Sequence, residues 1–362
     1  MGAALHVLHL VNRWEAGGVQ QHIRDLSAEL RQRGVRVSIA GWVKEGREAD
    51  PDVLFLPLYS RDGTRKSAAG FSRACMLLRR HARETRVDVL HMHSRYATPL
   101  GAVAVRGAGI ARVYTAHNTF RDLGSLPWYP KHIICPSAAV RDAFRDSVRD
   151  SARYALRVVL HGVRPAAMRQ RPGEGSPPLF LFLGRFTPSK GGEVLIDALA
   201  LLARRGVDGW AAAFVGDGPS GMEWRRRASE RGLDQRVRFD PWTSDPQAYL
   251  RNARVLVMPS VSLEGLPIAM LEAMAVGCPV IASDLPPFRE EFRNGGTGLV
   301  FRNHDSEQLA TLLEMVLAEP VRLDAMAEAA HAAVLRTHRL SSMADATMAV
   351  YREALSEATT AV

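Results

Sequence analysis

The sequence predicts an α/β protein of two Rossmann-like, doubly wound parallel-sheet domains facing a central cleft. Its 362 residues exceed the usual size of one hydrophobic core, so two domains are expected. Short apolar runs of strand length alternate with longer segments of helical period, which indicates βαβ units. Between two such halves lies the Pro-, Gly- and Arg-rich stretch RPAAMRQRPGEGSPP (164–178), which has neither period and predicts a linker.

The first predicted domain covers residues 1–165. Its expected helices are 19–33, 99–108 and 138–150. Its expected strands are LHVLHLV, VRVSIAGWV, VDVLHMH, ARVYTAH and HIICPS.

The linker is placed at 166–178, and the second predicted domain covers residues 179–340. Its expected strands are LFLFLG, GWAAAFVG, RVRF, ARVLVMPS, CPVIAS and TGLVF. Residues 341–362 predict a C-terminal helix, and its period does not decide on which domain it packs.

Composition narrows the cellular setting. No apolar run approaches the roughly 20 residues that span a bilayer, and the first residues lack a basic leader, so we expect a cytoplasmic protein. Cys75, Cys135 and Cys278 are far apart and form no CxxC pair, so buried reduced thiols are expected.

Positive charge gathers in the first half of the chain. Residues 1–170 carry 27 Lys and Arg against 14 Asp and Glu, and the remainder carries 20 against 24. This asymmetry favours an anionic partner, while a general preference for Arg is the plainer alternative. No nucleic-acid recognition motif accompanies it, so nucleic acid is not an expected partner.

The segment from Arg65 to Arg86 predicts an amphipathic basic helix, with Leu78 on the apolar face and Arg73 opposite. It fits a helix lying peripherally on the anionic inner face of the membrane or bordering an acidic acceptor site, and equally an ordinary amphipathic helix packed on the sheet.

The strongest motif is PSVSLEGLPIAMLEAMAVGCPVIAS, residues 259–283. A strand ends near Pro259, and a helix is expected to begin near Leu266 with Pro267 in its first turn. The N-terminus of such a helix suits a diphosphate. Glu264 and Glu272 are eight residues apart, which predicts two acids near one helical line. Either acid alone could equally be a surface residue.

Two further motifs follow strands. In LFLGRFTPSKGG a strand end delivers Arg185 and Lys190, two cations that can neutralise a departing nucleotide diphosphate. In WEAGGVQQHIRDLSAEL, Gly17 and Gly18 follow the first strand and open a helix, which lets backbone approach a phosphate or sugar closely. A solvated cation pair and a simple helix start are comparable alternatives.

Histidines also end two predicted strands, His91 and His93 in VLHMHSR and His117 in VYTAHNTF. A metal site would need a third convergent ligand, which HxH alone does not provide, so no metal site is expected. His117 is the better candidate for a sugar hydroxyl, and His91 for a core position.

In this order the glycine pair, TAHN, GR-x3-SKGG, VGDGP (215–219) and EGLPIAMLEAMAVGCPVIAS resemble the large retaining glycosyltransferase family 4, of the GT-B fold. The resemblance covers nearly the whole chain. It implies a hexosyltransferase that uses a nucleotide diphosphate sugar and acts on a glycan or lipid-linked acceptor, in cell-surface polysaccharide or lipopolysaccharide biosynthesis.

The resemblance also assigns roles. It implies that Arg185 and Lys190 hold the donor diphosphate and stabilise the leaving group. Glu272 matches the acid on the ribose, Glu264 the acid at the donor sugar, and His117 the residue at the transferred sugar. Backbone of the remaining donor-binding positions would meet sugar and phosphates: Gly17, Gly18, Gly265, Leu266 and Pro267.

The implied chemistry is departure of the nucleotide diphosphate, with the acceptor attacking the same face of an oxocarbenium-like sugar. Cations and a helix N-terminus would meet the diphosphate charge, so no Mg²⁺ and no other cofactor is expected. A nucleotide-sugar epimerase of the GT-B fold and a catalytically silent nucleotide-binding scaffold are the alternatives.

The chain departs from the family pattern at three places. Ser189 stands where Glu is common, His161 precedes Gly-Val where Asn is usual, and the stretch DLPPFREEFRNGGTGLVF (284–301) lacks the common Gly-Gly-x-x-Glu pattern. These differences concern the domain junction and base binding.

Overall fold

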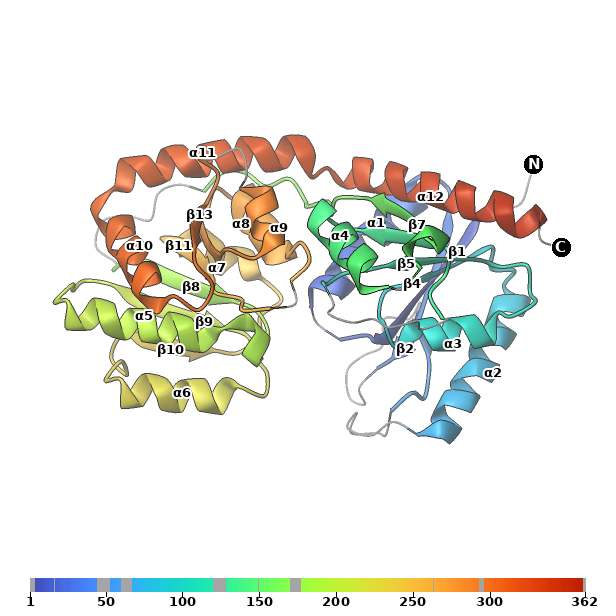
Figure 1. Cartoon of the computed structure of the whole chain (residues 1–362), viewed down its shortest axis with the longest axis horizontal. Coiled ribbons are helices and arrows are strands. Elements are labelled where there is room, and N and C mark those ends of the chain that lie inside the picture. The colour runs from blue at the N-terminus through green and yellow to red at the C-terminus, as the bar shows by residue number, and fades with distance from the viewer. Residues whose placement is uncertain are drawn as a thin grey trace. The chain divides into compact units, whose positions relative to one another are not determined.

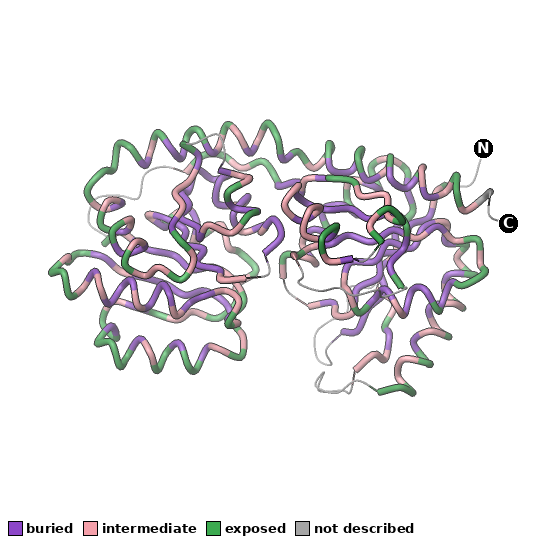
Figure 2. Tube along the Cα trace, viewed as in Figure 1, coloured by how far each residue is buried: buried purple, intermediate pink, exposed green. Residues whose placement is uncertain are grey.

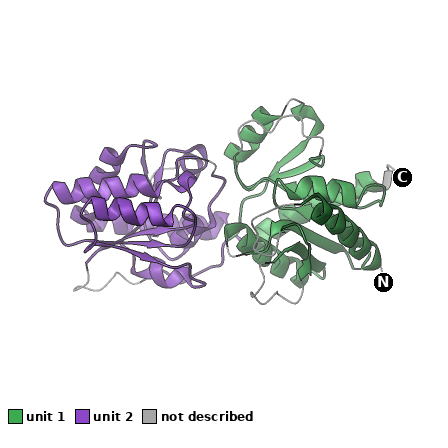
Figure 3. Ribbon diagram, turned by 90° about the horizontal axis from the view of Figure 1, so that it is seen from below, with its two compact units in different colours: residues 1–162, 340–362 green, residues 163–339 purple. Residues whose placement is uncertain are grey.

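The computed structural model describes residues 4–15, 17–43, 53–59, 67–119, 128–148, 150–169, 177–262, 264–292 and 296–360. The chain forms two compact units (Figure 3). Unit 1 contains residues 1–162 and 340–362, and unit 2 contains residues 163–339. Each unit has its own sheet and core, and each is described by itself.

Unit 1 is built on a parallel sheet (Figure 1). Its strand order among the described residues is β3-β2-β1-β4-β5-β6-β7. The order reverses between β1 and β4, and ligands of open α/β sheets bind beyond the carboxyl ends of the strands at such a switch point. The strands are β1 (His6–Arg13), β2 (Arg36–Trp42), β3 (Val53–Phe55), β4 (Val89–Met92), β5 (Ala111–Thr115), β6 (His132–Cys135) and β7 (Ala155–Val158).

Helices cover both faces of this sheet, because successive strand residues point to opposite sides. Leu8 and Leu10 of β1 pack on the face covered by α2 (Ala68–Glu84), α3 (Ala97–Ala104) and α4 (Ala138–Ser147). Val7 packs on the other face, against α1 (Gly18–Gln32) and α12 (Leu340–Thr360). The C-terminal helix therefore belongs to the first unit, which settles an alternative that the sequence left open.

Unit 2 is built on a second parallel sheet with the described order β10-β9-β8-β11-β12-β13. Its switch point lies between β8 and β11. The strands are β8 (Leu179–Leu183), β9 (Ala211–Val215), β10 (Val237–Asp240), β11 (Val255–Met258), β12 (Val280–Ser283) and β13 (Leu299–Phe301).

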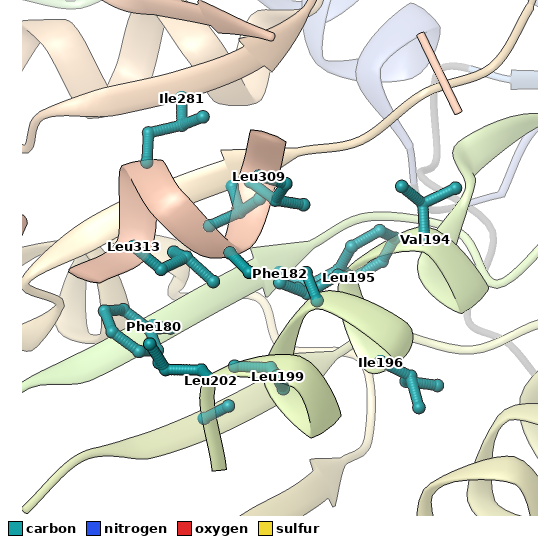
Figure 4. Packing of buried hydrophobic residues seen from close by; sticks show 14 of the residues in the cluster. Phe180, Phe182, Val194, Leu195, Ile196, Leu199, Leu202, Ile281, Leu309 and Leu313 are labelled. Carbon is teal, nitrogen blue, oxygen red and sulfur yellow. The ribbon is translucent and has the colours of Figure 1, made fainter. Parts of the chain in front are cut away.

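Helices also cover both faces of the second sheet. One face carries α5 (Gly192–Arg204), α6 (Gly221–Glu230) and α10 (Ser306–Ala318). The other carries α7 (Pro246–Asn252), α8 (Ile268–Ala275), α9 (Pro286–Glu291) and α11 (Pro320–Thr337). Figure 4 shows Phe180 and Phe182 of β8 packing with Leu199 of α5 and with Leu309 and Leu313 of α10. Buried residues follow the strands of both sheets (Figure 2).

The structure confirms the α/β class, the two parallel sheets and each expected strand. The expected helix at 99–108 is α3, which begins and ends earlier, at Ala97 and Ala104. The sequence did not predict β7, a strand at the sheet edge with two of its four residues exposed. None of the helices in the described ranges is long and apolar enough to cross a membrane.

The basic segment from Arg65 to Arg86 contains α2, and its first two residues lie outside the described part of the chain. Leu78 and Ala82 are buried against the sheet, while Arg73 and Arg80 are exposed. The apolar face of α2 is thus part of the core of unit 1, and only its cationic face meets solvent.

Residues 163–165, predicted as the end of the first domain, and residues 166–169, predicted as the start of the linker, lie in unit 2. Residues 170–176 are outside the described residues. Arg169 donates hydrogen bonds to the carbonyl oxygens of Gly277 (3.0 Å) and Ala253. This backbone is therefore attached to unit 2.

The cysteines carry no disulfide. Cys135 and Cys278 are buried and Cys75 is half-buried, which corrects the expectation of three buried thiols. Burial raises the pKa of Cys135 to about 12 and that of Cys278 to about 11, so both stay as neutral thiols.

Candidate functional site

In unit 2, the residues of the two strongest motifs lie at the carboxyl edge of the sheet, at its switch point. Arg185 and Lys190 follow β8, and Glu264 follows the neighbouring strand β11. The two loops are joined by a hydrogen bond from the Val261 N–H to the Ser189 carbonyl oxygen (2.9 Å). Parallel strands deliver their carboxyl ends to one edge, so residues 74 positions apart in sequence meet here.

Lys190 and Glu264 form an ion pair. The Lys190 Nζ donates to the Glu264 Oε1 at 2.5 Å, and the Ser260 hydroxyl donates to the same oxygen at 2.5 Å. The Glu264 side chain is only 4% exposed, whereas that of Lys190 is 29% exposed. A buried carboxylate needs such partners, and here they also fix the position of the ammonium group.

Close packing at this junction requires glycine at position 191. Gly191 adopts the left-handed conformation (φ 63°), and a Cβ added there would lie 2.0 Å from the Pro259 carbonyl oxygen. The turn after β8 can approach the end of β11 this closely only without a side chain. The glycine of the SKGG motif thus brings Lys190 within reach of Glu264.

Arg185 lies earlier on the same loop and is exposed. Its backbone is held through its neighbour Phe186, whose N–H donates to the Asp217 carbonyl oxygen (2.8 Å). The structure therefore presents one cation already paired at the edge of the sheet and a second, Arg185, in solvent on the same loop.

The helix of the EGLP motif is α8, and it begins later than the sequence predicted. Its first residue is Ile268, with Pro267 in the cap position, and no described side chain caps it. Gly265 and Leu266 are buried and Pro267 is half-buried in the loop before it. The uncapped end leaves first-turn N–H groups, a feature that suits an anion.

Glu264 and Glu272 do not share a helical line, so that expectation was wrong. Glu264 lies in the loop four residues before α8, and only Glu272 is helical, in the middle of α8 and half-buried. The eight-residue spacing predicts one helical line only if both acids are helical, and here the turn at Gly265-Leu266-Pro267 separates them. Glu264 lies in the loop between β11 and α8, and Glu272 lies in α8 itself.

Unit 1 holds the remaining predicted residues. Gly17 precedes α1 and Gly18 is its first residue, again with no described side chain capping the helix. His117 lies just beyond the end of β5 and is half-buried. Because β1 and β5 flank β4 in a parallel sheet, these residues share one edge of unit 1.

His117 belongs to a group of six histidine rings, which we call the histidine cluster. Neighbouring rings in it have centroids 4.0–5.6 Å apart. The cluster lies on the α1 and α12 face of the sheet, because strand residues two apart share a side with Val7, Val89 and Val113. Its members are His9, His22, His91, His93, His117 and His161.

Hydrogen bonds connect part of the histidine cluster. His9 Nδ1 lies 2.8 Å from His93 Nε2, and His93 Nδ1 lies 3.1 Å from His117 Nε2. Burial lowers the pKa of His9 to about 3, and burial followed by the neighbouring rings lowers the pKa of His22 and His93 well below 6.5. Burial and then His161 likewise lower the pKa of His117. These four rings are therefore neutral imidazoles.

Ser260, His9 and His22 were not singled out from the sequence. A strand-end serine four residues before an acid was a usable signal for Ser260. His9 lies in the middle of β1, where the parallel register places it opposite His91. His22 lies on α1, and only the packing of that helix on the sheet brings it to the cluster.

Comparison with known proteins covers both units. The model of glycosyl transferases group 1 matches residues 164–333, and that of Glycosyltransferase Family 4 matches residues 16–166. The phosphatidyl-myo-inositol mannosyltransferase of Mycobacterium leprae is 32% identical over 360 residues, which cover 92% of each chain. The D-inositol 3-phosphate glycosyltransferase of Nocardia farcinica is 29% identical, over 88% of this chain and 81% of that protein.

Among solved structures, Anabaena HepE in complex with UDP-glucose matches with a TM-score of 0.80 at 18% identity. The match covers 99% of this chain and all of that one. The two parallel sheets described above thus have the arrangement of strands and helices found in the GT-B fold.

Proposed function

This chain belongs to the glycosyl transferases of group 1 and is a glycosyltransferase of the GT-B type, and on that premise we propose that it transfers a hexose from a nucleotide diphosphate sugar with retention of configuration. The observation that carries the proposal is the pair Lys190 and Glu264 at the switch point of unit 2. A preformed ammonium group beside an uncapped helix N-terminus is suited to a diphosphate.

The donor diphosphate carries charge that must be met when it leaves. Lys190, the solvent-exposed Arg185 and the N–H groups of the first turn of α8 would meet it without a metal ion. Gly17 and Gly18 would offer backbone from unit 1, and Glu272 would bind the ribose hydroxyls. We therefore propose that transfer needs no Mg²⁺ and no other cofactor.

In the transfer step the bond from the sugar C1 to the diphosphate oxygen breaks and a bond from C1 to the acceptor oxygen forms on the same face. The proton of the acceptor hydroxyl passes to the departing diphosphate oxygen, so charges balance without an enzyme nucleophile. Glu264, held by Ser260 and Lys190, would accept a hydrogen bond from a sugar hydroxyl. His117 would contact the transferred sugar, because the unprotonated nitrogen of its neutral imidazole can accept a hydrogen bond from a hydroxyl group.

The proposed acceptor is an anionic lipid-linked or growing glycan of the cell surface, of the polysaccharide or lipopolysaccharide kind. The excess of basic residues in the first 170 positions supports an anionic acceptor. The named acceptors of the two relatives, phosphatidyl-myo-inositol and D-inositol 3-phosphate, carry phosphate as well. Both compounds should be among the first acceptors tested.

A lipid acceptor would be reached at the cytoplasmic face of a membrane, which we propose as the place of action. Because the apolar face of α2 is buried, attraction to anionic lipid would rest on the exposed Arg73 and Arg83, and on Arg80, which also pairs with Glu84 (2.7 Å). The exposed Met76, 65% accessible, lies among them. This binding would be electrostatic and peripheral.

A transfer assay tests the proposal. Purified protein in EDTA is offered UDP-, GDP- and ADP-hexoses with phosphatidylinositol, inositol 3-phosphate or a lipid-linked glycan, and the anomeric configuration of the product is read by NMR. The expected result is one donor consumed only when acceptor is present, with the anomer retained. Donor conversion without acceptor would indicate an epimerase, and an inverted product would contradict retention.

A further inference from the structure

The histidine cluster of unit 1 contains more imidazoles than the transfer chemistry uses. Only His117 has a proposed role at the sugar, yet five further rings surround it at the carboxyl edge of the sheet. All five are at most 5% exposed: His9, His22, His91, His93 and His161. Neutral imidazole is a common ligand of divalent transition metals, and a metal site requires about three such nitrogens to converge on one point.

Among the described residues, two groups of three histidines have nitrogen atoms within 4.8 Å of one another. The first, His9, His91 and His93, is poorly suited to an ion. Both nitrogens of His91 are already used, Nδ1 with the Tyr351 hydroxyl and Nε2 with the Thr115 hydroxyl, each at 2.7 Å. His91 is thus a core residue that fastens β4 to α12 and β5.

The second group, His22, His93 and His117, has the features of a binding site. Neither ring nitrogen of the buried His22 has a hydrogen-bond partner among the described residues. His93 Nδ1 and His117 Nε2 face each other at 3.1 Å, and each ring keeps its other nitrogen for a different neighbour or for solvent. A buried imidazole with both nitrogens unsatisfied is costly unless a ligand completes it.

We propose that His22, His93 and His117 form a site for one divalent transition-metal ion of the zinc class. Of the His-x-His pair only His93 belongs to this site. The fold adds His22 from α1 and His117 from just beyond the end of β5. Three protein ligands leave a fourth position for water or an anion, which is the composition of open zinc sites. An anion there would offset the charge of an ion held by neutral ligands.

One arrangement of the ring protons suits an ion. When His93 carries its proton on Nε2, it donates to His9 Nδ1 and presents an unprotonated Nδ1 to the ion. His117 with its proton on Nδ1 presents Nε2 in the same way, and the ion then replaces the hydrogen bond between His93 Nδ1 and His117 Nε2. Each ring keeps one proton, so binding needs no net proton release. His9 is then the supporting residue that fixes the orientation of His93.

Occupation of the site would restrain His117, the residue placed at the transferred sugar, and this consequence rests on the proposed function. A metal ion on His117 Nε2 removes that nitrogen from the sugar. Zinc at the protein concentration is therefore expected to slow transfer, and a chelator to restore it. Metal binding itself is measured without donor or acceptor, so its failure and failure of the transferase proposal are distinguishable.

The test uses the full chain purified without a polyhistidine tag, freed of metal by a chelator and then titrated with Co²⁺. We expect one Co²⁺ per chain with a visible absorption band of a tetrahedral nitrogen site, displaced by one equivalent of Zn²⁺. His22→Leu and His117→Asn should abolish the band. His9→Leu should weaken binding by about 10- to 100-fold, as loss of a supporting residue does.

His6→Gln is the matched control. His6 is a buried histidine on β1, the strand that also carries His9. Its ring contacts the Ser38 hydroxyl and the Thr85 carbonyl oxygen, outside the cluster. It should bind Co²⁺ like the wild type. Circular dichroism checks that each variant is folded, and His117→Asn, at a half-buried position, remains informative if His22→Leu is not. Absence of binding by the wild type, or wild-type binding by a folded variant of either ligand, overturns the proposal.

Discussion

At the scale of single residues, the environment of each ionisable group decides what it can do. Glu264 is a buried carboxylate with two partners on one oxygen, and Lys190 is the partner that can also reach a ligand. The ion pair keeps the ammonium group ordered before a donor arrives. Preorganised charge of this kind is what stabilises a leaving group at little cost.

Removing Lys190 should harm both stability and activity. Lys190→Ala leaves the buried Glu264 without its cation, so the melting temperature should fall, and kcat/KM should drop by roughly 10²- to 10³-fold. Calorimetry and the transfer assay measure the two effects. In the double variant Lys190→Met with Glu264→Gln, both charges are gone, so stability should recover while activity stays low. Recovery of activity in the double variant would mean that Lys190 does not meet the diphosphate.

The thiols give a prediction independent of the site. Because burial raises the pKa of Cys135 and Cys278 to about 12 and 11, their thiolate fraction near pH 8 is very small. In the native protein, only Cys75 should react with Ellman's reagent, and it should react slowly. In the unfolded protein, all three thiols should react. Cys75→Ser should remove the native reaction. Rapid modification of a second thiol in native protein would show that one of the two cores is more open than described.

At the scale of elements, the sequence predicted strands well because apolar runs of strand length are also the buried strands of parallel sheets. It missed β7, because Arg157 interrupts its apolar run and the strand lies half-exposed at the edge of the sheet. The acids of the EGLP motif were identified, but their supposed helical line was wrong. The histidine cluster could not be predicted, because His22 reaches it through packing of α1 on the sheet.

The turn between β8 and α5 provides an element-scale prediction. Gly191→Ala must place a Cβ against the Pro259 carbonyl oxygen and hold a left-handed residue, whereas Gly206→Ala, also left-handed (φ 76°), meets nothing within 4 Å. We expect about 1 kcal/mol of destabilisation at Gly206 and clearly more at Gly191, by denaturant unfolding. Nucleotide binding should weaken only at Gly191. Equal losses of stability would contradict the close approach of the two loops.

Helix α12 is attached to unit 1 by a buried hydrogen bond. The Tyr351 hydroxyl and His91 Nδ1 are 2.7 Å apart, and both residues are fully buried. Tyr351→Phe should cost about 1–3 kcal/mol, because it leaves a polar nitrogen of His91 unsatisfied. Tyr154→Phe, at a half-buried ring position, should change stability by about 0.5 kcal/mol or less. Thermal unfolding of both variants makes the comparison, and equal effects would contradict the assignment.

At the scale of the whole molecule, charge and chemistry are divided between the units. The basic excess belongs to the first half of the chain, and the paired Lys190 and Glu264 belong to unit 2. This division fits the proposal that unit 1 binds the acceptor and unit 2 binds the donor. It also means that donor binding can be tested without knowledge of the acceptor.

Membrane association is a prediction of the basic excess. Binding to vesicles that contain phosphatidylglycerol should be lost at high salt and on vesicles of neutral lipid, because only the cationic face of α2 is exposed. Flotation with Arg73→Glu and Arg80→Glu, against the control Arg205→Glu on α5's C-terminal side, measures the contribution of α2. Binding that is indifferent to salt would contradict an electrostatic contact.

Binding of nucleoside diphosphates in EDTA tests the assigned activity most directly. A thermal-shift series with UDP, GDP, ADP, CDP and dTDP should find one that stabilises the protein, by about 2.7 kcal/mol at 100 times its Kd. The shift should be lost in Lys190→Ala and Glu272→Ala, retained in Arg205→Ala, and unchanged by Mg²⁺. No stabilisation by any nucleotide, or stabilisation that appears only with Mg²⁺, would contradict a metal-independent donor site in unit 2.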